Sequence, residues 1–189
     1  MILAERNPEA RIVACESSQQ RLAALRDRVA GFGDCIECRL ADAAALNETA
    51  KYDLALVDVP CSGTGTLGRN PEIRHRLKVE DLPRHADRQK AILRAVVAAV
   101  RPGGRIVYST CSLEPEENDQ VIDGVLSEAG EVRRIPLVGR IDALRDAGIV
   151  TGEAADRLRE CITPEGALRL IPGALGTDGF FVAMLEKVS

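Results

Sequence analysis

Two cysteines stand in closely similar contexts in this sequence, because each follows an apolar run and each precedes a serine. Cys61 lies in "DVPCSGTGTLGRNPE" and Cys111 in "YSTCSLEPEEN". A thiolate is a strong nucleophile, and a second polar group beside it can assist by moving a proton. The chain holds six cysteines and no apparent secretory signal, so we expect reduced thiols that serve as buried residues, ligands or nucleophiles rather than disulfides.

Three carboxylates stand at comparable places, namely Glu16, Asp42 and Asp58. Glu16 and Asp58 end apolar runs, and Asp42 lies just past another one. Taken singly, each acid is explained as a cap or a solvated loop residue, and each cysteine has an equally ordinary explanation. Their shared position at the ends of several apolar runs is what favours a common site.

A metal site is not expected. The segment "CIEC" has the spacing of a metal-binding knuckle, but no second Cys-x-x-Cys follows it. The only histidines of the chain, His75 and His85, lie far from it in sequence.

Apolar runs alternate with helical patterns along the whole chain. The sequence predicts strands near residues 11–16, 35–40, 52–59, 105–111, 131–137 and 179–185, and helices near residues 22–29, 92–100, 115–129 and 141–159. The run at 52–59 is nearly continuous, as is typical of a parallel strand covered on both faces. This alternation predicts an α/β fold with a mostly parallel sheet, in which ligands bind outside the carboxyl ends of the strands. Both cysteines and all three acids fall at that edge.

Composition limits the other possibilities. A chain of 189 residues with 46% hydrophobic and 29% charged residues is typical of one globular domain. No apolar run approaches the ~20 residues of a membrane span, and "MILAERNPEAR" carries charges where a secretory signal is apolar, so we expect a cytoplasmic protein with no membrane partner. The net charge of −4 restricts any nucleic-acid contact to a local patch. The most basic segment, residues 69–90, fits such a contact and a solvated helix surface about equally well.

Three segments in order, "DVPCSGTGTLGRNPEIR", "YSTCSLEPEEN" and "TDGFFVAML", resemble the motifs of the Fmu/Sun family of RNA cytosine-5 methyltransferases. The resemblance covers nearly the whole chain. It implies a Rossmann-like methyltransferase sheet, mostly parallel with an antiparallel C-terminal strand. It also implies transfer of a methyl group from S-adenosylmethionine to carbon 5 of a cytosine in RNA, with ribosomal RNA the expected partner.

The resemblance implies roles for individual residues. Cys111 matches the nucleophile, and Cys61 matches the second cysteine that helps to release the product. Glu16 matches the acid that accepts the ribose hydroxyls of the cofactor, Asp42 the acid near the adenine amine, and Asp58 an acid near the methionine end. The chemistry agrees, because carbon 5 of cytosine becomes nucleophilic only after a thiolate adds to carbon 6. Asp58 could then stabilise the adduct through ring nitrogen 3 and the exocyclic amine.

The sequence departs from the family pattern at its start. Family members carry a glycine-rich loop of the type "APGGKT", with a strand before it, directly upstream of the segment that matches "ILAERNPEARIVACE". We therefore expect residues 1–189 to form a single, N-terminally truncated catalytic domain whose sheet lacks its first strand. A gap of this kind predicts weak binding of S-adenosylmethionine and rearrangement, poor order or self-association of the chain.

Two alternatives remain open. The chain could be a methyltransferase-like module that does not catalyse. It could instead methylate DNA cytosine or a small molecule, and DNA cytosine-5 enzymes resemble this chain at Pro60-Cys61 but use that cysteine as the nucleophile.

Overall fold

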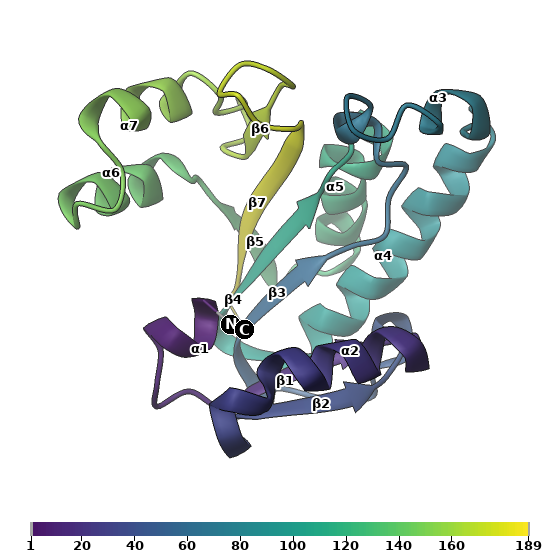
Figure 1. Cartoon of the computed structure of the whole chain (residues 1–189), viewed down its shortest axis with the longest axis vertical. Helices are drawn as coiled ribbons and strands as arrows, with labels where there is room; N and C mark the ends of the chain where they lie inside the picture. The colour runs from purple at the N-terminus through teal and green to yellow at the C-terminus, as the bar shows by residue number, and fades with distance from the viewer. Residues whose placement is uncertain (1, 189) are drawn as a thin grey trace. The chain divides into compact units, whose positions relative to one another are not determined.

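The computed structural model describes residues 2–188 and divides the chain into two compact units, Met1–Asn47 and Glu48–Ser189 (Figure 1). Each unit holds its own sheet. The first unit contains α1 (Ile2–Arg6), β1 (Ile12–Glu16), α2 (Gln19–Val29), the 3-10 helix η1 (Ala30–Cys35), β2 (Ile36–Leu40) and the 3-10 helix η2 (Ala43–Ala45).

The sheet of the first unit is a parallel pair. β1 and β2 run in register from Ile12 opposite Ile36 to Glu16 opposite Leu40, so their carboxyl ends coincide. Helix α2 begins where the Ser18 hydroxyl accepts a hydrogen bond from the backbone N–H of Arg21, as an N-cap serine does.

The second unit holds most of the chain. Its elements are β3 (Tyr52–Asp58), η3 (Thr64–Thr66), α3 (Ile73–Arg76), α4 (Asp81–Ala99), β4 (Val100–Thr110), η4 (Pro115–Glu117), α5 (Asp119–Glu128), β5 (Val132–Ile135), α6 (Val138–Asp146), α7 (Gly152–Arg159), β6 (Leu168–Leu170) and β7 (Phe180–Lys187). The strand order is β3-β4-β7-β5, and β6 also pairs with β7. β3 and β4 are parallel, whereas β7 is antiparallel to β4, β5 and β6. The α/β class and the antiparallel C-terminal strand are therefore confirmed.

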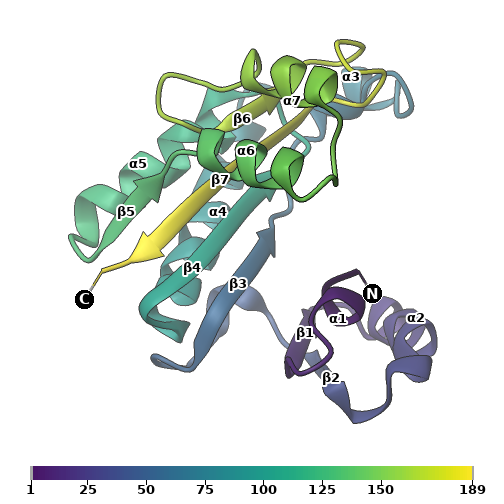
Figure 2. The ribbon, with the colours of Figure 1, turned by 90° about the vertical axis from the view of Figure 1, so that its left-hand side faces the viewer.

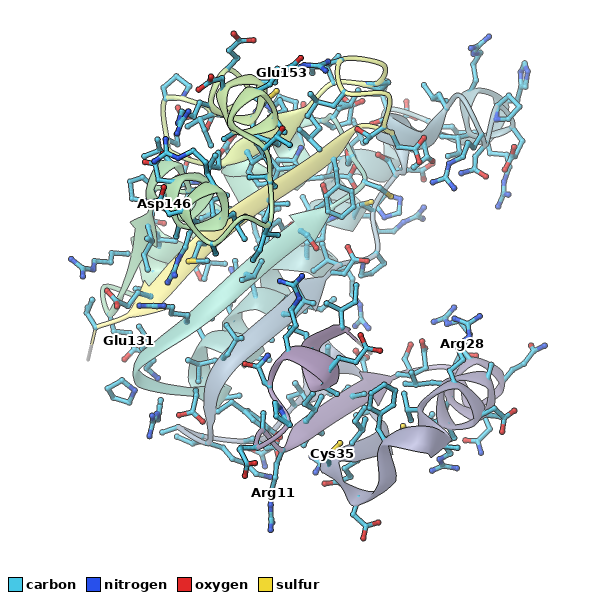
Figure 3. The ribbon with its side chains drawn as sticks, turned by 60° about the vertical axis from the view of Figure 1, so that its left-hand side comes forward. Arg11, Arg28, Cys35, Glu131, Asp146 and Glu153 are labelled. Atoms are coloured by element: carbon cyan, nitrogen blue, oxygen red, sulfur yellow. The ribbon has the colours of Figure 1, made fainter. Side chains whose placement is uncertain are left out.

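Helices lie on both sides of this sheet. Figure 1 and Figure 2 agree that α4 and α5 cover one face, while α6 and α7 lie on the other side, near β6 and β7. The exposed side chains of Asp146 and Glu153 mark these last two helices in Figure 3. The core is built where α4 and α5 meet the sheet, and it includes the fully buried Leu93, Ile106 and Phe181.

The interpretation of residues 52–59 as a strand covered on both faces is wrong. Leu54 and Leu56 of β3 are 51% and 57% exposed, whereas Val57 is only 7% exposed. The cause lies in the arrangement of the unit, since β3 ends the strand order and α4 covers only the face that carries Val57.

Two element boundaries also differ from the expected ones. Val100 continues the helical spacing of α4 in sequence, but it is the first residue of β4 and pairs with Tyr52. The helical stretch expected at 141–159 is two helices, and between them Gly148 adopts a φ of 68°, which favours glycine. The short strand β6 was not expected from the sequence.

Candidate active site

The site residues of the second unit lie where β3 and β4 end. Asp58, the last residue of β3, pairs in register with Ser109, so the loops that follow both strands emerge at the same edge. These loops bring the Sγ atoms of Cys61 and Cys111 to 3.3 Å from each other. The proximity expected from the strand ends is thus present, at a distance that allows one thiol to donate a hydrogen bond to the other.

A third segment, around Gly179, is hydrogen-bonded to the same loops. The backbone N–H of Gly65 donates to the carbonyl of Cys111 (2.9 Å), and the N–H of Gly179 donates to the carbonyl of Gly65 (2.8 Å). A Cβ on Gly65 would lie 2.4 Å from the Gly179 oxygen and 2.8 Å from the Cys111 oxygen. Glycine is therefore required at position 65, which joins the three sequence segments "SGTG", "TCS" and "TDGF".

The two thiols have different proton affinities. A hydrogen bond from Cys61 is the largest influence on Cys111 and lowers the pKa of that thiol to about 7. The same contact, together with burial, raises the pKa of Cys61 far above its ordinary value. The charges of Asp58 and Glu117 oppose ionisation of Cys111 but do not outweigh the neighbouring thiol. The main cause of the lowered pKa of Cys111 is therefore the neighbouring thiol of Cys61.

Asp58 lies beside this pair of thiols. Its Oδ1 accepts a hydrogen bond from the Ser109 hydroxyl at 3.0 Å, across the β3–β4 ladder. The residue is exposed, so the carboxylate is accessible from solvent.

Glu117 is part of the site, although nothing in the sequence around it singles it out. The residue is 0% exposed. Its carboxylate accepts hydrogen bonds from the backbone N–H and the hydroxyl of Ser62, and from Nε2 of Gln89 at 3.0 Å. Its backbone carbonyl accepts a hydrogen bond from the Tyr108 hydroxyl at 2.7 Å. The acidic run "EPEEN" resembles a solvated helix start, and only the buried neighbours distinguish this glutamate from Glu116.

The first unit holds the other two predicted residues. Oε1 of Glu16 accepts hydrogen bonds from the backbone N–H of Ser18 (2.8 Å) and from the guanidinium of Arg21 (2.7 Å). These contacts, led by the one with Arg21, lower the pKa of Glu16 to about 2. Asp42 caps η2, because its Oδ1 accepts from the N–H of Ala44 at 3.0 Å. Both acids lie at the carboxyl end of the two-stranded sheet, where the N–H of Ala41 donates to the carbonyl of Glu16.

The remaining candidate features have structural explanations. The Cys35 thiol donates to the carbonyl of Phe32, and residues 2–188 contain no group of three or more His, Cys, Asp or Glu residues suited to a metal ion. Tyr108 and Phe181 are core residues in edge-to-face contact. Within the basic segment, Arg69 forms an ion pair with Asp178. No helix in residues 2–188 combines the length and apolar character that a membrane crossing requires.

A family model described as 16S rRNA methyltransferase RsmB/F matches residues 1–186. The probable ribosomal RNA small subunit methyltransferase B of Bacillus subtilis (strain 168) is 35% identical over 143 residues, which are 74% of this chain and 28% of that protein. The ribosomal RNA small subunit methyltransferase B of Enterobacter sp. (strain 638) is 33% identical over 184 residues, which are 95% of this chain and 37% of that protein. The chain thus spans well under half the length of these relatives.

A solved structure is also similar. The crystal structure of NSun6 from Pyrococcus horikoshii with SFG superposes with a TM-score of 0.72 and 25% sequence identity. The match covers 95% of this chain and 42% of the other.

Proposed function

Because the chain belongs to the 16S rRNA methyltransferase RsmB/F family, we propose that residues 1–189 form the catalytic domain of an RNA cytosine-5 methyltransferase that uses a covalent cysteine adduct. The observation that carries this proposal is the 3.3 Å contact between the Sγ atoms of Cys61 and Cys111 at the ends of β3 and β4. Family membership supports an RNA methyltransferase, and the chemistry open to two adjacent thiols supports carbon 5 of cytosine as the position of methylation.

Cys111 is the nucleophile. With a pKa of about 7, a large fraction of its thiol is ionised at neutral pH, whereas the raised pKa of Cys61 keeps that residue protonated. The Cys111 thiolate adds to carbon 6 of the cytosine, a C–S bond forms, and the electron pair of the 5,6 double bond makes carbon 5 nucleophilic. In its protonated form the Asp58 carboxyl group donates a hydrogen bond to ring nitrogen 3, where negative charge would otherwise accumulate, and its other oxygen accepts one from the exocyclic amine.

Cys61 acts after the adduct has formed. Once Cys111 is bonded to carbon it carries no negative charge, so the largest cause of the raised pKa of Cys61 is removed. Cys61 can then lose its proton to water and, as a thiolate, take the proton from carbon 5. The electrons of that C–H bond re-form the 5,6 double bond, the C–S bond breaks, and Cys111 leaves as a thiolate.

The first unit offers residues suited to S-adenosylmethionine, which supplies the methyl group when bound. A carboxylate at the end of a strand in a Rossmann-like unit commonly accepts ribose hydroxyls, and Glu16 has this position, with both of its short contacts on one oxygen, Oε1. Asp42 lies at the same end of the sheet, two residues after the end of β2. In this position its carboxylate could accept a hydrogen bond from the adenine amine. The related archaeal structure contains SFG, an analogue of S-adenosylmethionine, which supports this cofactor.

The test is a covalent trap with 16S rRNA transcript and S-adenosylmethionine, read as protein–RNA complexes that survive denaturing electrophoresis. Cys61→Ala should accumulate the adduct, because release is impaired, and Cys111→Ala should form none. Cys161→Ala, which changes a cysteine near the end of α7, should behave as the unaltered protein. An adduct in Cys111→Ala but not in Cys61→Ala would support a DNA-type mechanism, and no adduct in any variant would support a non-catalytic module.

A further inference from the structure

Glu117 is a buried carboxylate whose hydrogen bonds come from neutral donors. The Ser62 backbone N–H lies 2.8 Å from Oε1, the Ser62 hydroxyl contacts Oε2, and Gln89 Nε2 lies 3.0 Å from Oε1. Burying a carboxylate is costly unless several hydrogen bonds replace its water, so the loss of one of these donors would leave the buried charge poorly compensated. Two of these contacts come from Ser62, the residue that follows Cys61.

The network holds Cys61 on both sides. Gln89 donates through Nε2 to the carbonyl of Pro60 at 2.9 Å, the residue before Cys61, and also to Glu117. Glu117 in turn accepts from Ser62, the residue after it. The backbone that carries the Cys61 side chain is therefore fixed by one amide and one carboxylate from α4 and η4.

Cys111 is held by the residue adjacent to Glu117. The Asn118 side-chain amide donates to the carbonyl of Ser112 at 3.0 Å, and the Thr110 hydroxyl donates to Asn118 Oδ1 at 2.6 Å. The Ser62 and Ser112 hydroxyls lie 3.1 Å apart and complete the link. Glu117 and Asn118 thus hold the two serines that follow the two cysteines.

We propose that Glu117 is a positioning residue that holds the Cys61 thiol against Cys111 and thereby determines which of the two sulfurs ionises. The proposal deepens the function given above, because it assigns a role in the same thiol pair. Glu117 is fully buried and does not touch substrate, so it acts only through Ser62 and Gln89.

The position and the charge of Glu117 have opposite effects on the pKa of Cys111, so substitutions can separate them. The charge of Glu117 raises the pKa of both thiols, whereas the contact that it maintains between them lowers the pKa of Cys111. The other charged or titratable groups that act on this pair are Asp58, Tyr108 and Arg69. Glu117→Gln keeps the shape and removes the charge, because its amide oxygen can accept at the Oε1 position while its NH₂ donates to the Ser62 hydroxyl. Glu117→Ala removes both.

The experiment measures the alkylation rate of each cysteine by iodoacetamide across pH 5 to 10 in the full chain, with mass spectrometry of the peptides that contain Cys61 and Cys111. Glu117→Ala should lose the preference for Cys111, and its Cys111 rate at pH 7 should fall by at least about threefold as the thiol returns toward its ordinary pKa. Glu117→Gln should keep the preference, with the Cys111 profile moved to lower pH. Glu116→Gln, which removes a neighbouring charge in η4, is the control and should leave both profiles unchanged.

Several results would overturn the proposal. An unchanged preference and profile in a folded Glu117→Ala would show that the thiol contact does not depend on this residue. If Glu117→Ala does not fold, Glu117→Gln still decides the matter. Loss of the preference for Cys111 in Glu117→Gln would contradict the proposal, because this variant keeps the shape of the side chain. A Cys111 profile identical to that of the unaltered protein would also contradict it, because the charge has been removed. Alkylation requires neither RNA nor cofactor, so these outcomes are independent of the covalent trap that tests the function itself.

Discussion

The two units of the chain hold their candidate site residues in different ways. In the first unit, Glu16 is held mainly by Arg21, whose side chain is 68% exposed. In the second unit, Cys61 and Cys111 are held by Glu117 and its neighbours, which are buried. The buried polar residues of the described chain all lie in the second unit, and they are Thr64, Thr66, Gln89, Ser109, Thr110, Ser112, Glu117, Asn118 and Lys187.

This difference separates a preorganised site from an adaptable one. A buried, satisfied hydrogen-bond network fixes side chains because each lost contact leaves an unpaired polar group in a low dielectric. An exposed ion pair contributes little and is screened by salt, so it positions a side chain only loosely. We expect the thiol geometry to resist solution conditions that move Glu16, and changes in each unit test this contrast.

The largest effect is expected where the three loops of the second unit meet. Gly65→Ala places a Cβ against the backbone carbonyls of Gly179 and Cys111, and backbone atoms cannot rotate away as side chains do. The free energy of unfolding should fall by about 2–3 kcal/mol, as for an overpacked core, measured by urea unfolding. Gly68→Ala is the matched control, because its Cβ meets nothing within 4 Å. Equal stability of the two variants would contradict a rigid junction of the loops.

A second effect concerns the thiol pair itself. Cys61→Ala removes the hydrogen bond that lowers the pKa of Cys111, while the charge of Asp58 continues to raise it. The alkylation profile of Cys111, which should rise through pH values near 7 in the unaltered protein, should move to higher pH. At pH 7 the rate should fall at least roughly fivefold, because a rise of one unit from a pKa of about 7 lowers the thiolate fraction from about a half to about a tenth. An unchanged profile would mean that another group, such as Arg69, sustains the thiolate.

The strand ends that carry the site could be predicted from the sequence, but the buried hydrogen bonds that hold the site residues could not. The edge position of Cys61, Cys111 and Asp58 follows from apolar runs and the rule for parallel sheets, and the structure brings these residues together. The role of Glu117 could not be predicted, because an acidic residue after a proline usually marks a solvated helix start. Its burial depends on Gln89, which lies 28 residues away on another helix.

The same limit applies to β3 and β4. Val100 continues an apolar helical spacing, and only its pairing with Tyr52 makes it a strand residue. Leu54 and Leu56 suggest a strand covered on both faces, whereas exposure depends on which neighbours the sheet has. Strand pairing and the burial of each sheet face depend on the whole folded unit, so the residue pattern of one segment does not determine them.

The smallest effect is expected in the first unit, at Arg21. Arg21→Ala removes the largest cause of the lowered pKa of Glu16, so the carboxylate should titrate above its present value of about 2, toward the ordinary 4.5. Because the folded pKa is depressed, the stabilisation from this pair is complete above about pH 4.5 and is lost as the pH falls toward 2. At neutral pH the stability should change little, since the pair is exposed and screened. NMR titration of the Glu16 carboxyl carbon at low and high salt measures the shift, with Arg26→Ala on the same helix as the control. A titration curve that neither salt nor Arg21→Ala moves would show that Glu16 is held as firmly as the thiols, and the contrast between the units would fail.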